Sequence, residues 1–271
     1  MRALAAVLLC APAAFADGGE LHPAETLRML EDARIVFLGE QHDNPAHHAR
    51  QAELVADLAP AALVFEMLTE AQAGAVTPAL VADRAALEAA LGWADSGWPD
   101  FAMYHPIFAA APGAAVYGAA LPRAEARQVM EGAAADVFGA EADRYGLTVP
   151  LPADQQEARE ALQAAAHCDV LPVEMLPGMV EVQRLRDAFL ARAALAALDE
   201  TGGPVVVITG NGHARRDWGA PAFLARVAPD VPVATLGQGE ASHGAPKGGF
   251  DAVEIGPDVD RGDPCDSFAT R

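Results

Sequence analysis

The sequence alternates between short, continuously apolar runs and longer alanine-rich segments whose apolar residues recur at helical spacing. Continuous apolar runs of this length are typical of strands that are buried on both faces. Six of them stand out, most bounded by Gly or Pro: residues 33–39, 61–67, 114–119, 203–210, 231–237 and 250–256. Because helical segments separate most of these runs, the pattern predicts an α/β fold, a mainly parallel sheet with helices on both faces.

Two helices can be placed from local signals. Asn44 followed by Pro45 predicts a helix start, with a capping side chain before a proline at the first helical position. Residues 177–200 form the longest helical pattern and lead into the strand at 203–210, as a right-handed crossover would. Residues of about 121–170 have helical composition and little strand signal, so we expect them to form a smaller, inserted helical lobe.

The first 16 residues have the features of an export signal. A single arginine precedes an apolar run, and residues 14–16 form an A-x-A cleavage motif, which predicts a mature protein that begins at Asp17. We expect residues 17–271 to form a single domain. A lipoprotein signal would need a small residue before its cysteine, whereas leucine precedes Cys10. The prediction is therefore a soluble periplasmic or secreted protein rather than a lipoprotein, and no later apolar stretch reaches the ~20 residues of a membrane span.

Charge and cysteine content narrow the range of functions. The formal net charge of −20 argues against binding to nucleic acid or to an anionic membrane surface. Once the signal is removed, Cys168 and Cys265 are the remaining cysteines. Two cysteines in an exported chain favour one disulfide that closes a long loop, with free buried thiols as the alternative.

Titratable side chains cluster where the predicted strands end. Glu40 and His42 follow the first strand, Glu66 closes the second, and His213 comes shortly after the fourth. Ligands of open parallel sheets bind outside the carboxyl ends of the strands. We therefore expect these four side chains to meet at one edge of the sheet, although they are far apart in the sequence.

Two Gly-x-x-His tetrads, GEQH at 39–42 and GNGH at 210–213, contribute to this cluster. We expect each first glycine to adopt backbone angles closed to other residues and to end its strand sharply. Imidazole and carboxylate groups are suited to a divalent transition metal and equally to general acid–base chemistry. The simpler alternative, a turn with a polar cap at each tetrad, stays open, and so does the question of whether the protein is an enzyme.

Two further histidines, His47 and His48, are adjacent on the helix that Pro45 begins. Neighbouring helical positions point in different directions, so at most one of them can face the site. His48 shares a face with Gln51, and we expect His47 to meet solvent.

The chain resembles a known family through a series of segments in a fixed order. These are VFLGEQHDNPAHHARQ, LVFEM, YHPIFAAA, VYGAALPR, HC, RLRDAFLA and VVVITGNGHARRDWGAP, spread over about residues 30–240. Together they resemble ChaN-like proteins of the haem-binding uptake, Tiki superfamily. The resemblance implies a parallel-sheet domain with a small helical lobe and haem binding in iron or haem uptake. It also implies a homodimer that holds two haems face to face, and transport components as partners.

Haem requires an axial donor and a cation for its propionates. Tyr104, His105 and His213 are the candidate axial donors, and Arg215 and Arg216 are the candidate partners of the propionates. Because proline follows His105, we expect extended or turn backbone there.

The same resemblance leaves an alternative function open. Relatives in the wider superfamily include Tiki-type metal-dependent proteases and erythromycin esterases. This alternative is a metal-dependent hydrolase that binds Mn, Co or Zn. Its metal ligands and catalytic residues would be Glu40, His42, Glu66 and His213.

Overall fold

The protein contains one six-stranded sheet in which every pair of neighbouring strands is parallel. The computed structural model describes residues 23–132, 134–262 and 265, so the predicted export signal and the start at Asp17 lie outside the described residues. The strand order is β3-β2-β4-β1-β5-β6. Each predicted apolar run corresponds to one strand, although β1 and β5 extend beyond the predicted ends, and this confirms the α/β prediction. The strands are β1 Ile35–Glu40, β2 Ala62–Phe65, β3 Ala115–Gly118, β4 Val205–Gly210, β5 Val233–Glu240 and β6 Ala252–Gly256.

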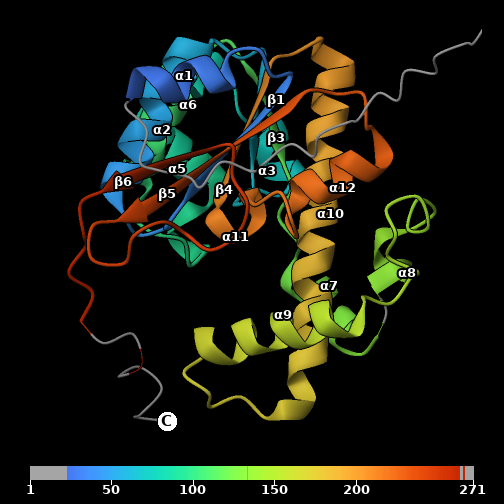
Figure 1. Cartoon of the computed structure of the whole chain (residues 1–271). Coiled ribbons are helices and arrows are strands. Elements are labelled where there is room, and N and C mark those ends of the chain that lie inside the picture. Colours follow the sequence, from blue (N-terminus) through green and yellow to red (C-terminus); the bar gives the residue numbers. More distant parts are fainter. Residues whose placement is uncertain (1–22, 133, 263–264, 266–271) are drawn as a thin grey trace, which may run out of the picture.

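Helices cover both faces of the sheet (Figure 1). On one face lie α1 Pro23–Leu30, α2 Pro45–Leu58, α3 Glu70–Gly74, α4 Pro78–Val81, α5 Arg84–Leu91, the 3-10 turn η1 Trp93–Asp95 and α6 Phe101–Ala110. The other face and the lobe contain α7 Arg123–Met130, α8 Ala134–Phe138, α9 Ala153–Ala166, the 3-10 turn η2 Val173–Met175, α10 Leu176–Thr201, α11 Asn211–Ala214 and α12 Ala220–Val227. Within the described residues, no helix combines the length and the apolar character that crossing a bilayer requires.

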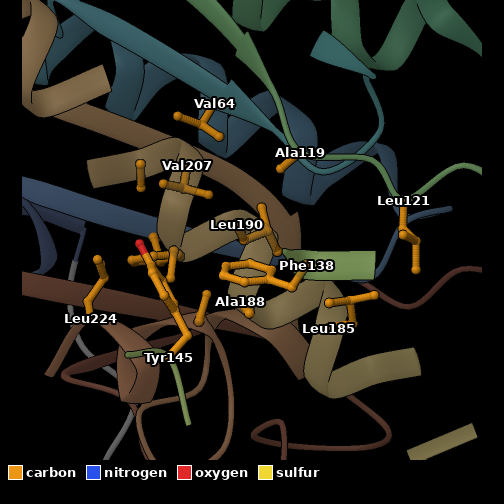
Figure 2. Close-up of a cluster of buried hydrophobic side chains, with 14 of the residues drawn as sticks. Val64, Ala119, Leu121, Phe138, Tyr145, Leu185, Ala188, Leu190, Val207 and Leu224 are labelled. Atoms are coloured by element: carbon orange, nitrogen blue, oxygen red, sulfur yellow. The ribbon is translucent and has the colours of Figure 1, made fainter. Parts of the chain in front are cut away.

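The side chains of the strands pack into two separate hydrophobic cores, one on each face of the sheet, because successive side chains of a strand point to opposite faces. Val36 and Leu38 of β1 enter the core beneath α2 and α6, whereas Phe37 enters the core beneath α10. Figure 2 shows the second core, where Val64 and Val207 of the sheet meet side chains of α10 and Tyr145 of the lobe. Both faces of the central strands β1, β2 and β4 are thus buried, which explains why these strands are almost continuously apolar.

The lobe is organised around α10, which extends well beyond the sheet (Figure 1). Helices α7, α8 and α9 pack against it. A disulfide joins Cys168, just after α9, to Cys265, with Cα atoms 5.7 Å apart, and the predicted pairing is confirmed. The lobe therefore draws on the predicted segment 121–170 together with the first half of α10.

Local sequence signals predicted the start of α2 correctly but the backbone conformation at His105 incorrectly. Asn44 caps α2 by accepting a hydrogen bond from the backbone N–H of Ala46, with Pro45 at the first helical position, as predicted. The prediction of extended or turn backbone at His105 was wrong, because His105 lies inside α6 although Pro106 follows. Three buried aromatic side chains anchor this helix to the core, namely Phe101, Tyr104 and Phe108. Tertiary packing therefore overrides the local preference at this proline.

Candidate functional site

The edge of the sheet at the carboxyl ends of its central strands brings the predicted residues together. Glu40 is the last residue of β1, Glu66 directly follows β2, and His213 lies in α11, directly after β4. Because β4 lies between β2 and β1, these chain ends are neighbours. The imidazole Nε2 of His213 is 3.5 Å from a carboxylate oxygen of Glu66.

Glu40 is the buried acceptor of the first part of the site. One oxygen of its carboxylate is 2.7 Å from Nδ1 of His42 and accepts a hydrogen bond of 3.0 Å from the hydroxyl of Tyr104. The other oxygen is 3.3 Å from Nδ1 of His48. The imidazole of His42, whose side chain is 35% exposed, packs edge-on against Trp98. Glu40 therefore fixes the ring of His42 through Nδ1 and leaves Nε2 directed elsewhere.

The electrostatics of this part favour a positively charged imidazole. Burial lowers the pKa of His42, but the hydrogen bond to Glu40 and the charges of Glu66 and Asp43 outweigh it and raise the pKa to about 9. Burial and the charge of Glu40 raise the pKa of Tyr104, so this phenol stays protonated and acts as a donor.

Glu66 connects the two imidazoles. One of its carboxylate oxygens accepts hydrogen bonds from the hydroxyl of Thr209 at 2.7 Å and from the N–H of Gly210 at 2.9 Å. Burial raises the pKa of Glu66, but the charges of His213 and His42 and these two hydrogen bonds lower it to about 2. Glu66 is therefore a buried carboxylate whose charge is balanced by imidazoles on two sides.

His213 has a partner that the sequence pattern did not reveal. Its Nδ1 is 2.7 Å from an oxygen of Asp187, which lies in the middle of α10. Burial lowers the pKa of His213, but the charges of Glu66 and Asp187 raise it above its usual value. Burial raises the pKa of Asp187, and the charge of His213 opposes this. The only available sequence signal was an acidic residue on the mostly apolar face of a long helix, four residues before Ala191.

The first glycines of the two tetrads are needed for close approach rather than for unusual backbone angles, so that expectation was wrong. Neither Gly39 nor Gly210 is among the glycines with positive φ, and Gly210 has φ −62° and ψ 150°. A Cβ at Gly39 would lie 2.5 Å from Oδ1 of Asn211, and one at Gly210 would lie 2.9 Å from Nε2 of His42. The glycines thus let the side chains of the site pack against the strand ends.

His47 is the other correction, because it is buried rather than exposed to solvent. Its Nδ1 accepts a hydrogen bond from the N–H of Gln41, and its Nε2 bonds to the carbonyl oxygen of Gly239, each at 3.0 Å. Helix α2 starts between two loops at the sheet edge, so adjacent side chains of its first turn reach different strands. His47 links the tips of β1 and β5, and His48 faces Glu40.

The other residues predicted to bind haem form contacts away from this cluster. His105 bonds through Nε2 to the carbonyl oxygen of Val81 at 2.9 Å. Arg215 forms a two-pronged ion pair with Asp217, and Arg216 pairs with Asp251, so neither guanidinium group faces Glu66. The structure therefore brings together Glu40, His42, Glu66, His213 and Tyr104, and leaves His105, Arg215 and Arg216 outside that cluster.

The donors predicted for a metal do not form a compact ligand set. Among the described residues, the group of three whose ligating atoms all lie within 4.8 Å of one another consists of Glu240, His243 and Asp258. Glu240 in that group already accepts hydrogen bonds from Asn44 and Arg261. The arrangement of Glu40, His42, Glu66 and His213 thus gives no support to the divalent-metal alternative.

A cleft of about 530 Å³ opens beside the site, and we call it the Trp98 cleft. Glu66 lies at its inner end, and Trp98, Leu121 and Leu190 supply apolar walls. Arg123 and Arg186 also line it, and neither has an ion pair within the described residues. The cleft therefore combines an apolar surface with two cations, and the partly exposed imidazole of His42 packs against Trp98, one of its walls.

Comparisons with known proteins identify the family and the fold. The model of the family described as "Haem-binding uptake, Tiki superfamily, ChaN" matches residues 26–224. The solved structure "Cofacial heme binding to ChaN of Campylobacter jejuni" is 19% identical, with a TM-score of 0.65, over 85% of this chain and 90% of that chain. The type III effector HopBA1 is 14% identical, with a TM-score of 0.47, over 91% of this chain and 100% of that one, too weak a likeness to carry an argument. No curated protein matches significantly.

Proposed function

Because the chain belongs to the ChaN family of haem-binding uptake proteins, we propose that it binds haem and serves in haem or iron uptake. The observation that carries this proposal is the family match, which covers residues 26–224. The ChaN protein of Campylobacter jejuni binds haem cofacially, and the two chains share the fold.

We place the haem in the Trp98 cleft, with His42 as its axial donor. His42 is held through Nδ1 by Glu40, so Nε2 is the nitrogen left to ligate iron. The apolar walls suit a porphyrin, and the guanidinium groups of Arg123 and Arg186 suit its propionates. When bound, haem would supply an iron centre and a large apolar surface.

The other axial donors named from the sequence are less accessible. The hydroxyl of Tyr104 is buried and donates to Glu40, and His105 bonds to a backbone carbonyl. Nε2 of His213 faces Glu66. Each would have to give up a buried contact before it could ligate iron, whereas His42 would only have to release the Nε2 proton that its raised pKa favours.

We also propose that a second copy of the chain covers the exposed face of the haem. The Trp98 cleft is open to solvent along one side, so a bound porphyrin would leave an apolar face in water, which favours pairing. Light scattering of the purified protein tests this: haemin should convert monomers into dimers, and an unchanged mass with haem bound would exclude it.

Export to the periplasm, with the signal at residues 1–16, completes the proposal. The Cys168–Cys265 disulfide supports an oxidising compartment. Expression in a bacterial host followed by mass spectrometry should detect, in the periplasmic fraction, a chain that begins at Asp17. An unprocessed chain retained in the cytoplasm would contradict it.

The decisive experiment is an absorbance titration with haemin. We expect a Soret band that saturates at one haem per chain, and its loss or displacement in the variant His42→Ala. His243→Ala, which removes an imidazole that is 74% exposed and outside the cleft, is the matched control. No saturable Soret band in the unmodified protein would overturn haem binding. A band kept in His42→Ala but lost in Tyr104→Phe would overturn only the choice of ligand.

A further inference from the structure

A second cavity, which shares no lining residue with the Trp98 cleft, lies on the lobe side of the site. It has a volume of about 380 Å³, within the range of small-molecule pockets. Leu162 of α9, Val180 of α10 and Trp218 form apolar walls, and His213 lies at its inner end beside Asp187. We call it the Arg159 cavity. The contact between Glu66, which lines the cleft, and His213 separates the two spaces.

Positive charge is concentrated around this cavity although the chain as a whole is strongly acidic, with a formal net charge of −20. Arg159, Arg215 and Lys247 line it, and Lys247 is the only lysine in the sequence. Arg215 is neutralised by Asp217 through two hydrogen bonds of 2.6 Å. Within the described residues, Arg159 and Lys247 have no ion pair, so their charges are available to a ligand.

Arg159 is the unusual member of this group. It is only 9% exposed, and its Nε is buried without a hydrogen-bond partner. Its one side-chain hydrogen bond is donated to the neutral amide oxygen of Gln155, at 3.1 Å. Burial lowers the pKa of Arg159; the charge of Asp187 opposes this, and the charges of Arg184 and Arg215 add to it. A buried guanidinium with an unpaired donor and no counter-ion is costly, and an anion in the cavity would relieve that cost.

The indole of Trp218 fixes the orientation of the cations. The guanidinium carbon of Arg215 is 4.0 Å from the ring centroid and that of Arg159 is 5.1 Å from it. Such stacking holds a guanidinium group in place while its N–H donors remain able to bind an oxyanion. The same ring offers an apolar surface to the rest of a ligand.

We propose that the Arg159 cavity binds the oxyanion group of a small molecule, a carboxylate or a phosphate, through Arg159 and Lys247. The apolar part of the ligand packs against Trp218 and Leu162. The two sources of such a group are a free small anion and a propionate of haem. Binding of a free anion does not depend on the haem function proposed above.

The test is calorimetry on the full chain without its predicted export signal and without haem. Inorganic phosphate and benzoate are the free-anion probes. Haemin, compared with haemin dimethyl ester, tests the propionate. Arg159→Gln should weaken binding by at least about tenfold, because it removes a charge-assisted contact. Lys247→Gln, at an exposed position where folding is not at risk, should weaken it several-fold. Arg127→Gln on the exposed side of α7 removes the same charge elsewhere and should change nothing.

Two results support the proposal and two overturn it. Saturable binding of phosphate or benzoate that is weakened in both variants identifies a free anion. If neither probe binds, but haemin binds more tightly than its dimethyl ester and Arg159→Gln abolishes that difference, the oxyanion is a propionate. No binding of either probe together with equal affinity for haemin and its ester overturns the proposal. Binding that Arg127→Gln weakens as much as Lys247→Gln overturns it too, because the interaction would then be non-specific.

Discussion

Two imidazole–carboxylate pairs lie at the same edge of the sheet, and they are assembled in different ways. In the Glu40–His42 pair the partners are two residues apart at the end of one strand. In the Asp187–His213 pair they are 26 residues apart, on α10 and on the turn after β4. Both bonds run through Nδ1 and both measure 2.7 Å. The side chain of His42 is 35% exposed, whereas that of His213 is 11% exposed.

This difference in exposure indicates different roles for the two pairs. His42 is oriented by a buried carboxylate and can still meet a ligand at its other nitrogen, which is the usual arrangement of a ligating histidine. His213 directs its other nitrogen at Glu66 and is largely buried. The first pair is suited to binding, and the second is suited to holding the charge of Glu66 and the junction between sheet and lobe.

The largest loss of stability is expected when Glu40, the buried partner in the Glu40–His42 pair, is removed. Glu40→Ala removes the carboxylate that bonds to His42 and Tyr104 and lies 3.3 Å from Nδ1 of His48. It should cost about 3–5 kcal/mol of unfolding free energy because it leaves buried polar groups without partners. Chemical denaturation measures this. Glu31→Ala, at an exposed position after α1, is the matched control. A loss no greater than that of the control would mean that Glu40 does not organise this part of the site.

The carboxylate of Glu66 is stabilised by the charges of both His42 and His213, so its contribution to stability depends on pH. The pKa of Glu66 falls from 4.5 to about 2 on folding, so its contribution to stability is complete above pH 4.5 and disappears as the pH falls through 2. We expect Glu66→Gln to be less stable than the unmodified protein by about 2–3 kcal/mol at neutral pH, with the gap closing toward pH 2. Denaturation curves at several pH values measure the gap. A constant difference across that range would contradict the assigned charge.

The second pair should respond with a smaller loss of stability and a clear change in titration. Asp187→Asn keeps an acceptor for His213 but removes the charge, which should cost about 1–2 kcal/mol. Because the charge of Asp187 raises the pKa of His213, the variant should lower that pKa, which NMR titration of the imidazole measures. Asp199→Asn, an exposed position on the same helix, should leave it unchanged. If the pKa of His213 is unaltered in Asp187→Asn, the charge of Asp187 does not act on His213, and the second pair is not the charged pair described here.

The first pair could be predicted from the sequence, and the second could not. Glu40 and His42 sit in one tetrad after a recognisable strand, so their proximity is local. Asp187 was hidden because its partner lies on another element, and only the position of α10 across the sheet joins them. The same limit applies to Arg159, since the helical pattern of α9 does not show that its guanidinium lies over Trp218 and lines a cavity shared with the segment after β5.

By itself the sequence determined the parallel sheet, the capped start of α2 and the arrival of Glu40, Glu66 and His213 at one edge. These follow from apolar periodicity, from local capping and from the rule that parallel strands end on the same side. The tertiary structure alone decided which distant side chains became partners, such as Asp187 and His213, and which side chains kept an open face. Hydrogen bonding and burial depend on how helices cover the strand ends, and that covering is not encoded in any one segment of the chain.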